Sequence, residues 1–295
     1  MAVKQGSRHR SRAPRRGAAR AGLAILDDVL CGVDGTRTSY EAVRQAASLT
    51  GAKGHLSLLA VSGEYAHSRQ RNSIQQATLG KVRLRRALDY SRAVAMRAGV
   101  PVDADVDQRT KVADVLLERA QAHSLLALGA PSMSRMAHLL LGGVTSTAVH
   151  RLPTSLLIAR QPPRGAAFAQ RIVVAGDASA DSDKLLDFGI ALALTRNAEL
   201  LLIHAAGAES RFQPTRLGSQ AERIGRSLAH RGGLSVVPGR AERVIIAGAG
   251  QAKASLVVIS SRHLKGPRAL ASVSERIVHD APCSVLVVRP EDLSG

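Results

Sequence analysis

Hydrophobic residues follow two alternating patterns along the chain. An apolar run at residues 29–33 ends at Asp34-Gly35-Thr36, and residues 43–50 then place their apolar side chains on one helical face. A short apolar run bounded by a turn is typical of a strand buried on both sides, and apolar positions three and four residues apart are typical of a helix packed on a sheet. These residues therefore predict a strand, a turn and a helix.

The alternation continues to residue 159. It predicts four more strands, at residues 56–61, 100–106, 125–128 and 155–159, and helices in a long basic region that ends near Arg97, around residues 112–120 and from Val144 onward. Strands that alternate with helices favour right-handed crossovers, which build a mostly parallel sheet with helices on both faces. We therefore predict an open five-stranded α/β domain.

The whole order of elements occurs a second time. Residues 30–34 match residues 173–177 at an offset of 143 positions. The last strand also has a match, because residues 152–160 resemble residues 281–289, here at an offset of 129 positions. Self-similarity at a long period is the signature of a repeated unit. The chain thus predicts two tandem domains, each with its own five-stranded sheet, and the second is about fourteen residues shorter.

Composition marks where these domains begin and end. Residues 1–28 carry seven basic residues among Ala, Gly, Ser and Pro, which predicts a disordered basic tail because such a segment cannot bury enough surface to fold alone. Two consecutive prolines within residues 161–168 break any helix there and indicate a linker. Residues 29–160 are then the first domain and residues 169–295 the second.

The charge is higher than a domain that binds a small ligand needs. The net charge is +18 and the pI is near 11.3. Outside the tail, the densest basic region runs from Arg69 to Arg97, where eight basic residues accompany one acid, Asp89. Such a face attracts phosphate backbones, although a solvated arginine-rich surface is the simpler explanation.

Several function classes have no support in the sequence. It contains no HxxxH pattern, no Ser-His-Asp arrangement and no GKS or GKT phosphate loop, so we expect a protein that is not an enzyme, with weak ATPase activity left open. Cys31 and Cys283 lie in or beside apolar runs without metal-site spacing, which indicates buried thiols in a reducing compartment. Because no apolar run reaches the length of a membrane span or a signal peptide, we expect a cytoplasmic protein.

Two groups of residues are candidates for ligand binding. Asp34 follows the first strand, at the sheet edge where α/β proteins bind ligands and where a carboxylate can accept hydrogen bonds from a ribose or a base; the alternative is that it caps the next helix. Gly129 follows the fourth strand, and Gly142-Gly143 precede the helix from Val144, so backbone amides there can approach a phosphate. The alternative is that these glycines only form tight turns.

These residues resemble motifs of the universal stress proteins, and the likeness covers both copies, from about residue 28 to 290. Val33-Asp34-Gly35-Thr36 is similar to the family's Val-Asp-Gly-Ser, and residues 129–143 keep the spacing of its Gly-x2-Gly-x9-Gly-Ser/Thr pattern. Ser132 and Gly143 depart from it: a side chain restricts the backbone at the first position, and a hydroxyl is lost at the second.

The resemblance implies a Rossmann-like fold and a first domain that binds ATP or a related adenine nucleotide, with Mg²⁺ only as the nucleotide's counter-ion. It implies that Asp34 contacts the nucleoside and that Val61 packs near the adenine. The residues that it implies around the phosphates are Gly129, Ser132, Gly142, Gly143, Val144 and Thr145.

The second copy has lost these markers. Its loop begins at Ser260 and carries none of the family's glycines, although Asp177 remains at the end of the strand. Asp181 and Asp183 follow, and they would repel a polyphosphate if they faced the site. Because the family commonly forms dimers through the last strand, the resemblance implies that residues 155–159 and 284–288 form an internal interface, and it leaves a homodimer open.

Two functions therefore stand. The resemblance implies a stress-response regulator in which an adenine nucleotide biases conformation or partner choice. The alternative is a basic scaffold that binds RNA, the ribosome or DNA phosphates through the tail and the face from Arg69 to Arg97, without nucleotide dependence. Since the sequence shows no aromatic stacking platform, zinc-finger spacing or helix-turn-helix, such binding would depend on phosphates and weaken with salt.

Overall fold

The computed structural model describes residues 22–62, 73–131, 143–177, 179–207, 214–261 and 273–293, with residues 73–79 described by their backbone. Its elements follow the predicted order in both halves. The first half contains η1 (Ala24–Leu26), β1 (Asp28–Gly32), α2 (Arg37–Thr50), β2 (His55–Val61), α3 (Ser73–Arg97), β3 (Val102–Asp107), α4 (Val112–Ala120), β4 (Leu125–Gly129), α5 (Gly143–Arg151) and β5 (Ser155–Ala159). The second half contains β6 (Arg171–Gly176), α6 (Ala180–Arg196), β7 (Glu199–Ala206), α7 (Pro214–Leu228), η3 (Ala229–Arg231), β8 (Gly232–Pro238), α8 (Ala241–Gln251), β9 (Leu256–Ser260), α9 (Val273–Asp280), β10 (Ser284–Val288) and η5 (Pro290–Leu293).

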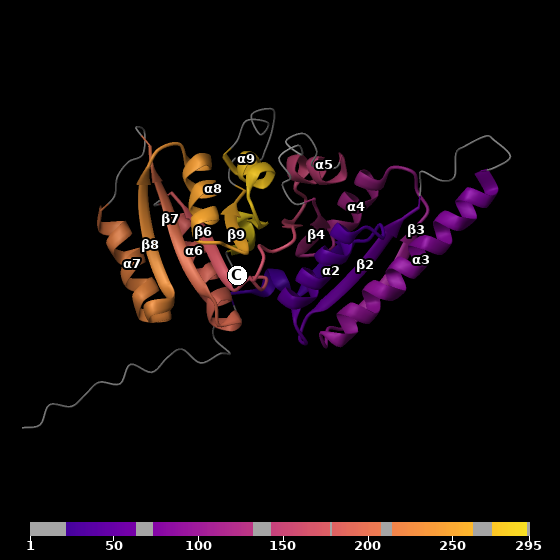
Figure 1. Ribbon diagram of the computed structural model, residues 1–295, viewed down its shortest axis with the longest axis horizontal. Helices are drawn as coiled ribbons and strands as arrows, with labels where there is room; N and C mark the ends of the chain where they lie inside the picture. Colours follow the sequence, from indigo (N-terminus) through magenta and orange to yellow (C-terminus); the bar gives the residue numbers. More distant parts are fainter. Residues whose placement is uncertain are drawn as a thin grey trace, which may run out of the picture.

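The two predicted five-stranded sheets form one continuous sheet. Its strand order is β3-β2-β1-β4-β5-β10-β9-β6-β7-β8, which repeats the order 3-2-1-4-5 in each half and reverses it at the centre. Neighbouring strands are parallel within each half, and only β5 and β10, which pair Leu157 with Leu286, are antiparallel. The predicted interface between the last strands is confirmed, and it relates the two halves by a pseudo-twofold axis (Figure 1).

Helices cover both faces of this sheet, as the alternation of elements predicted. One apolar core joins the sheet to α2, α3, α6, α7 and η1, and a second core on the opposite face joins it to α4, α5, α8 and α9. Aliphatic side chains make up nearly all of both cores, in keeping with an aromatic content of 2%. Figure 1 shows the two halves side by side, with the helices of each half above and below its strands.

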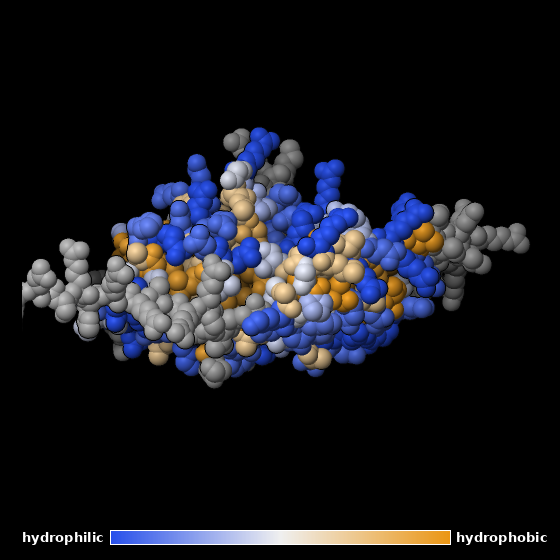
Figure 2. All heavy atoms as spheres, turned by 90° about the horizontal axis from the view of Figure 1, so that it is seen from below, coloured by the Kyte–Doolittle hydropathy of each residue, from blue (hydrophilic) through white to orange (hydrophobic). Residues whose placement is uncertain are grey.

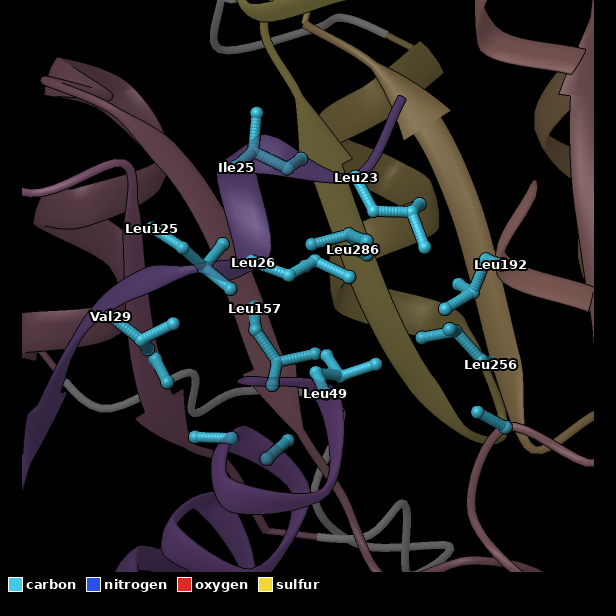
Figure 3. Close-up of a cluster of buried hydrophobic side chains, with 14 of the residues drawn as sticks. Leu23, Ile25, Leu26, Val29, Leu49, Leu125, Leu157, Leu192, Leu256 and Leu286 are labelled. Atoms are coloured by element: carbon cyan, nitrogen blue, oxygen red, sulfur yellow. The ribbon is translucent and has the colours of Figure 1, made fainter. Parts of the chain in front are cut away.

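Residues 22–28 correct the predicted tail. Leu23, Ile25 and Leu26 are at least 94% buried, and Asp28 begins β1. Figure 3 shows Leu26 beside Leu286, where the two halves of the sheet meet. The sequence prediction was wrong here because the average composition of residues 1–28 is dominated by arginine, and three apolar residues are too few to show a period. Residues 1–21, which make up the rest of the predicted tail, lie outside the described residues.

A buried polar network ties the two halves together at the centre. The Ser284 hydroxyl donates to Gln45 Oε1 (2.7 Å), and Gln45 Nε2 donates to the backbone oxygen of Arg160 (2.7 Å). The guanidinium of Arg160, 2% exposed, donates to backbone oxygens of Val278 and Cys283 in the second half. Burial lowers the pKa of Arg160 to about 10, so the charge is held at a cost in solvation and is stabilised by these carbonyl groups.

Both cysteines are buried and unpaired, as the sequence predicted. Burial raises the pKa of Cys283 to about 12 and raises the pKa of Cys31 even further. Both thiols therefore stay protonated and unreactive at neutral pH. The helices in the described ranges include none that is long and apolar enough to cross a membrane.

The lowered pKa of His279 on α9 makes the stability of the protein depend on pH. Burial lowers the pKa of His279 below its ordinary value of 6.5; nearby Arg160 and His150 act in the same direction, and Glu275 and Asp280 oppose them. The unfolded chain therefore binds this proton more readily than the folded protein does. The contribution of His279 to the free energy of unfolding is fully present above pH 6.5 and is lost as the pH falls from 6.5 toward the lower pKa of the folded state.

We therefore compare urea unfolding at about pH 5.5 and about pH 7.5, one value on each side of the ordinary pKa of histidine, and we expect the lower midpoint at the lower pH. His279→Gln should reduce the difference between the two midpoints because it removes the titrating group. His230→Gln, at an exposed position on η3, is the matched control and should leave the difference unchanged. An unchanged pH dependence in His279→Gln would contradict the prediction.

Candidate functional site

A cavity of about 260 Å³ lies at the carboxyl edge of the first-half sheet, beside the ends of β1 and β4. These strands flank the point where the strand order reverses, which is where open α/β sheets bind ligands. The first turns of α2 and α5 and one face of α4 complete its walls. The residues that line it are Gly32, Val33, Asp34, Thr38, Ser39, Leu59, Val61, Val112, Leu116, Leu128, Gly129, Pro131, Gly143, Val144 and Thr145.

Most of the residues that the sequence singled out meet in this cavity. Asp34, Val61, Gly129, Gly143, Val144 and Thr145 all line it. Ser132 and Gly142 lie outside the described residues. Sequence reasoning missed the apolar wall made by Leu128 of β4 and Leu116 of α4. Their apolar periodicity was visible, but it indicates burial and does not say that one end of a buried element borders a cavity.

Asp34 occupies the end of the first strand in an exposed position. Its Oδ1 accepts hydrogen bonds from the Thr36 backbone amide (2.8 Å) and the Thr36 hydroxyl (2.7 Å). The helix cap itself is Thr36, whose hydroxyl oxygen accepts from the amide of Ser39 (3.2 Å). Asp34 thus holds the residue that caps α2 and is not the cap. Its second carboxylate oxygen accepts no hydrogen bond from the described residues, so it can receive one from a ligand.

Gly129 brings β4 into close contact with α2. A Cβ atom at this position would lie 2.3 Å from the backbone carbon and oxygen of Thr38, a distance that real Cβ atoms do not reach. Only glycine therefore lets the end of β4 and the first turn of α2 approach in this way. The glycine that the sequence interpreted as a phosphate contact is thus also a structural requirement of the cavity.

The first turn of α5 forms the opposite wall. Gly143 is exposed, and a Cβ atom added to it would have nothing within 4 Å, so this position faces open space. Val144 and Thr145 follow it along the wall. The free amides and the positive dipole end of a helix favour an anion at such a place. This wall therefore offers backbone donors to a negatively charged group.

The cavity has one charged side chain among the described residues that line it, the carboxylate of Asp34. A phosphate here would be held by backbone amides and by hydroxyl groups such as that of Thr38. Across the described ranges, no group of three or more His, Cys, Asp or Glu residues could hold a metal ion. The chemistry that this arrangement offers is hydrogen bonding at both ends of an apolar cavity.

The second half retains a related but smaller cavity of about 170 Å³. Asp177 lines it in the place of Asp34 and likewise accepts from the amide of the residue that caps the next helix, Ser179 (3.1 Å). Ser260 lines it where the first half has Gly129. Asp183, which was expected to repel a polyphosphate if it faced the site, points instead to α7, where its Oδ1 accepts from Gln220 Nε2 (2.7 Å).

A comparison with protein families gives two matches along the chain. The model of the universal stress protein family matches residues 26–160 and, a second time, residues 169–289. The chain belongs to the universal stress protein family. No curated protein matches this universal stress protein at a significant level. Its two family domains coincide with the two halves of the sheet.

Solved structures share the tandem architecture of this universal stress protein. A universal stress protein from Archaeoglobus fulgidus DSM 4304 is 18% identical, has a TM-score of 0.73 and is aligned over 90% of this chain and 99% of its own. A functionally unknown protein from Pseudomonas aeruginosa PAO1 is 17% identical, has a TM-score of 0.62 and is aligned over 93% of this chain and 96% of its own. At these identities the likeness shows the fold alone, and it extends over both domains.

Proposed function

We propose that the first domain of this universal stress protein binds ATP or a related adenine nucleotide and that its occupancy regulates a response to stress. The observation that carries the proposal is the cavity at the point where the strand order reverses. The second carboxylate oxygen of Asp34 lies on one side of it and the first turn of α5 on the other. A nucleotide has a polar sugar, an apolar base and an anionic phosphate chain, and the cavity offers a matching group for each.

The residues fit the nucleotide in the following way. Asp34 accepts hydrogen bonds from ribose hydroxyls through its second oxygen. Val61, with the apolar wall of the cavity, packs against the adenine. The amides at Gly143 and Val144 hold phosphate oxygens, and Mg²⁺ serves only to balance phosphate charge. At about 260 Å³ the described part of the cavity is near the lower end of ligand pockets, about 300 Å³.

We propose binding rather than catalysis as the role of this site. Hydrolysis requires a base that positions water near the phosphates, and no histidine lines the cavity among the described residues. Asp34 lies at the sugar end in the proposed arrangement, away from the phosphates. Regulation would then follow from a difference in affinity between two conformations of the protein. The free, buried cysteines are in keeping with action in the cytoplasm.

The nucleotide proposal predicts different results for two equivalent aspartates. Asp34→Asn keeps an oxygen that can accept from Thr36 but replaces the free oxygen with an amide that donates. We expect ATP affinity, measured by calorimetry on the full chain, to fall tenfold or more, which corresponds to about 1.5 kcal/mol. Asp177→Asn makes the same change in the second half and should alter the affinity by less than about twofold.

Two outcomes would contradict this proposal. The first is that the wild-type protein shows no binding of ATP, ADP or AMP at millimolar nucleotide concentration. The second is an equal loss of affinity in both asparagine variants, which would place the nucleotide in neither cavity specifically. Thermal unfolding of each variant checks that its fold is retained, since Thr36 keeps its acceptor in Asp34→Asn.

A further inference from the structure

The helix α3 presents an unusual charged surface. It spans 25 residues, about 37 Å along its axis, and lies at the outer end of the first half, with its first turns reaching past the sheet (Figure 1). One side packs on the sheet through buried residues such as Leu84, Leu88 and Ala95. The opposite side is exposed and carries six basic residues, namely Lys81, Arg83, Arg85, Arg86, Arg92 and Arg97.

The six cations are not neutralised by ion pairs in the part of the protein that the structure describes. Within the described part of the chain, none of them has an ion-pair partner, and Asp89 is the only acid on the helix. Like charges held together without partners raise the energy of the folded state. An arrangement of this kind needs a separate explanation, because surface charge for solubility alone does not require it to gather on one helix.

The equivalent helix of the second half supplies the comparison. On α7, Arg223 Nη2 lies 2.8 Å from Asp187 Oδ1, and Arg216 Nε lies 3.6 Å from Asp183 Oδ2. Both acids are supplied by α6. The two helices occupy equivalent places on the same sheet, so the fold does not impose the charge of α3. The difference belongs to the surface of the first half.

The cations form two rows along the helix. At 100° per residue, Lys81, Arg85 and Arg92 fall on one flank of the exposed side, and Arg83, Arg86 and Arg97 fall on the other. A narrow strip between the rows carries Val82, Met96 and the acid Asp89. Val82 and Met96 are 40% and 61% exposed, and Asp89 is also exposed. Figure 2, a view from below, shows hydrophilic residues beside hydrophobic ones at the end of the molecule that carries α3. Two rows separated by the width of a helix suit a partner with two lines of negative charge.

We propose that α3 binds the phosphate backbones of duplex DNA, with the helix along the major groove and one row of cations toward each strand. A helix with its side chains is about 10–12 Å across, and the major groove of B-DNA is about 12 Å wide. The major groove of duplex RNA is too narrow and deep for a helix. The binding is driven by charge and reads no sequence through these six residues, and it does not depend on the nucleotide cavity.

Two other anionic partners fit the surface less well. Single strands need exposed aromatic rings for base stacking, and on α3 the described exposed ring, that of Tyr90, already packs edge-on against Tyr40 with centroids 4.7 Å apart. A helix that binds a membrane surface inserts a broad apolar face. The broad apolar face of α3 is buried against its own sheet, and only the narrow strip remains.

The test measures binding of the full-length protein to a fluorescent mixed-sequence duplex of about 20 base pairs between about 50 and 200 mM salt. One variant carries Lys81→Gln, Arg85→Gln and Arg92→Gln, and the other carries Arg83→Gln, Arg86→Gln and Arg97→Gln. Each contact with a phosphate contributes about 1 to the slope of log affinity against log salt. Each variant should therefore reduce that slope by about 3 and weaken binding at least about tenfold at the lowest salt.

A matched control removes the same charge elsewhere. Arg164→Gln, Arg226→Gln and Arg243→Gln are exposed positions outside α3, and together they should change the affinity by less than about threefold. Glutamine keeps the helix propensity close to that of arginine and lysine, and circular dichroism checks the fold. If a triple variant fails to fold, Arg92→Gln alone should reduce the slope by about 1.

Three results would overturn the inference. The first is that the duplex does not bind. The second is that one row variant behaves like the control, which would show that the two rows do not act together. The third is that single-stranded RNA or vesicles of phosphatidylserine and phosphatidylcholine bind more tightly than the duplex at equal salt. Duplex binding that loses slope in both row variants, and not in the control, supports it.

Discussion

Leu26→Ala is expected to lower the free energy of unfolding by about 3–5 kcal/mol. The Leu26 side chain is 2% exposed and belongs to the core that joins the two halves. In Figure 3 it lies on the sheet beside Leu286, with Leu157 close by. Removing three carbon atoms loses their burial and leaves a cavity that the rigid sheet beneath cannot close. The loss should appear as a lower midpoint in urea unfolding with little change in slope.

The control for this prediction is Met96→Ala. Met96 is 61% exposed on α3, so its truncation should change the free energy of unfolding by less than about 0.5 kcal/mol. If Leu26→Ala behaved in the same way, residues 22–28 would not be part of the core. The comparison therefore tests the correction that the structure makes to the predicted tail.

Gly129→Val is expected to destabilise the protein by about 3 kcal/mol and to abolish ligand binding in the first cavity. The new Cβ atom would lie 2.3 Å from the backbone of Thr38, and backbone atoms cannot move aside as a flexible side chain can. The end of β4 must then withdraw from α2. Since both elements line the cavity, its shape cannot survive the shift. Urea unfolding and ATP calorimetry measure the two effects on the same preparation.

Gly143→Ala is the control for Gly129→Val, because it replaces a cavity glycine that has no close neighbours. A Cβ atom at Gly143 would have nothing within 4 Å, and alanine favours the first turn of α5 over glycine. The free energy of unfolding should therefore stay within about 1 kcal/mol of the wild-type value, or rise slightly. Equal destabilisation by Gly129→Val and Gly143→Ala would contradict the assignment of a special close contact to Gly129.

The two domains keep the same framework and differ at their sites. Asp34 and Asp177 both hold the residue that caps the next helix, so this aspartate has a structural role in each half whether or not a nucleotide binds. The difference lies in the fourth strand, where Gly129 is matched by Ser260, and in the volume of the cavity. We expect ligand binding in the first domain for this reason, and a role for the second domain in pairing.

How much of this site the sequence could predict depends on what each residue does. Asp34 and Gly129 were identified because a turn at the end of a strand is visible in the sequence, and the spacing to Gly143 is kept. The apolar wall at Leu116 and Leu128 was not identified. An apolar residue in a cavity wall and one in a core have the same pattern in the sequence, and only the distances between elements distinguish them.

The sequence by itself determined the elements, their order and their duplication, because hydrophobic periodicity is a local property and a repeat needs no structure to be recognised. The tertiary structure alone decided that Leu23 and Leu26 are core residues and that Asp183 faces α7. It also decided that the cations of α3 have no ion-pair partner among the described residues. Each of these depends on contacts between residues far apart in the chain. A local pattern contains no information on such contacts until the sheet brings the residues together.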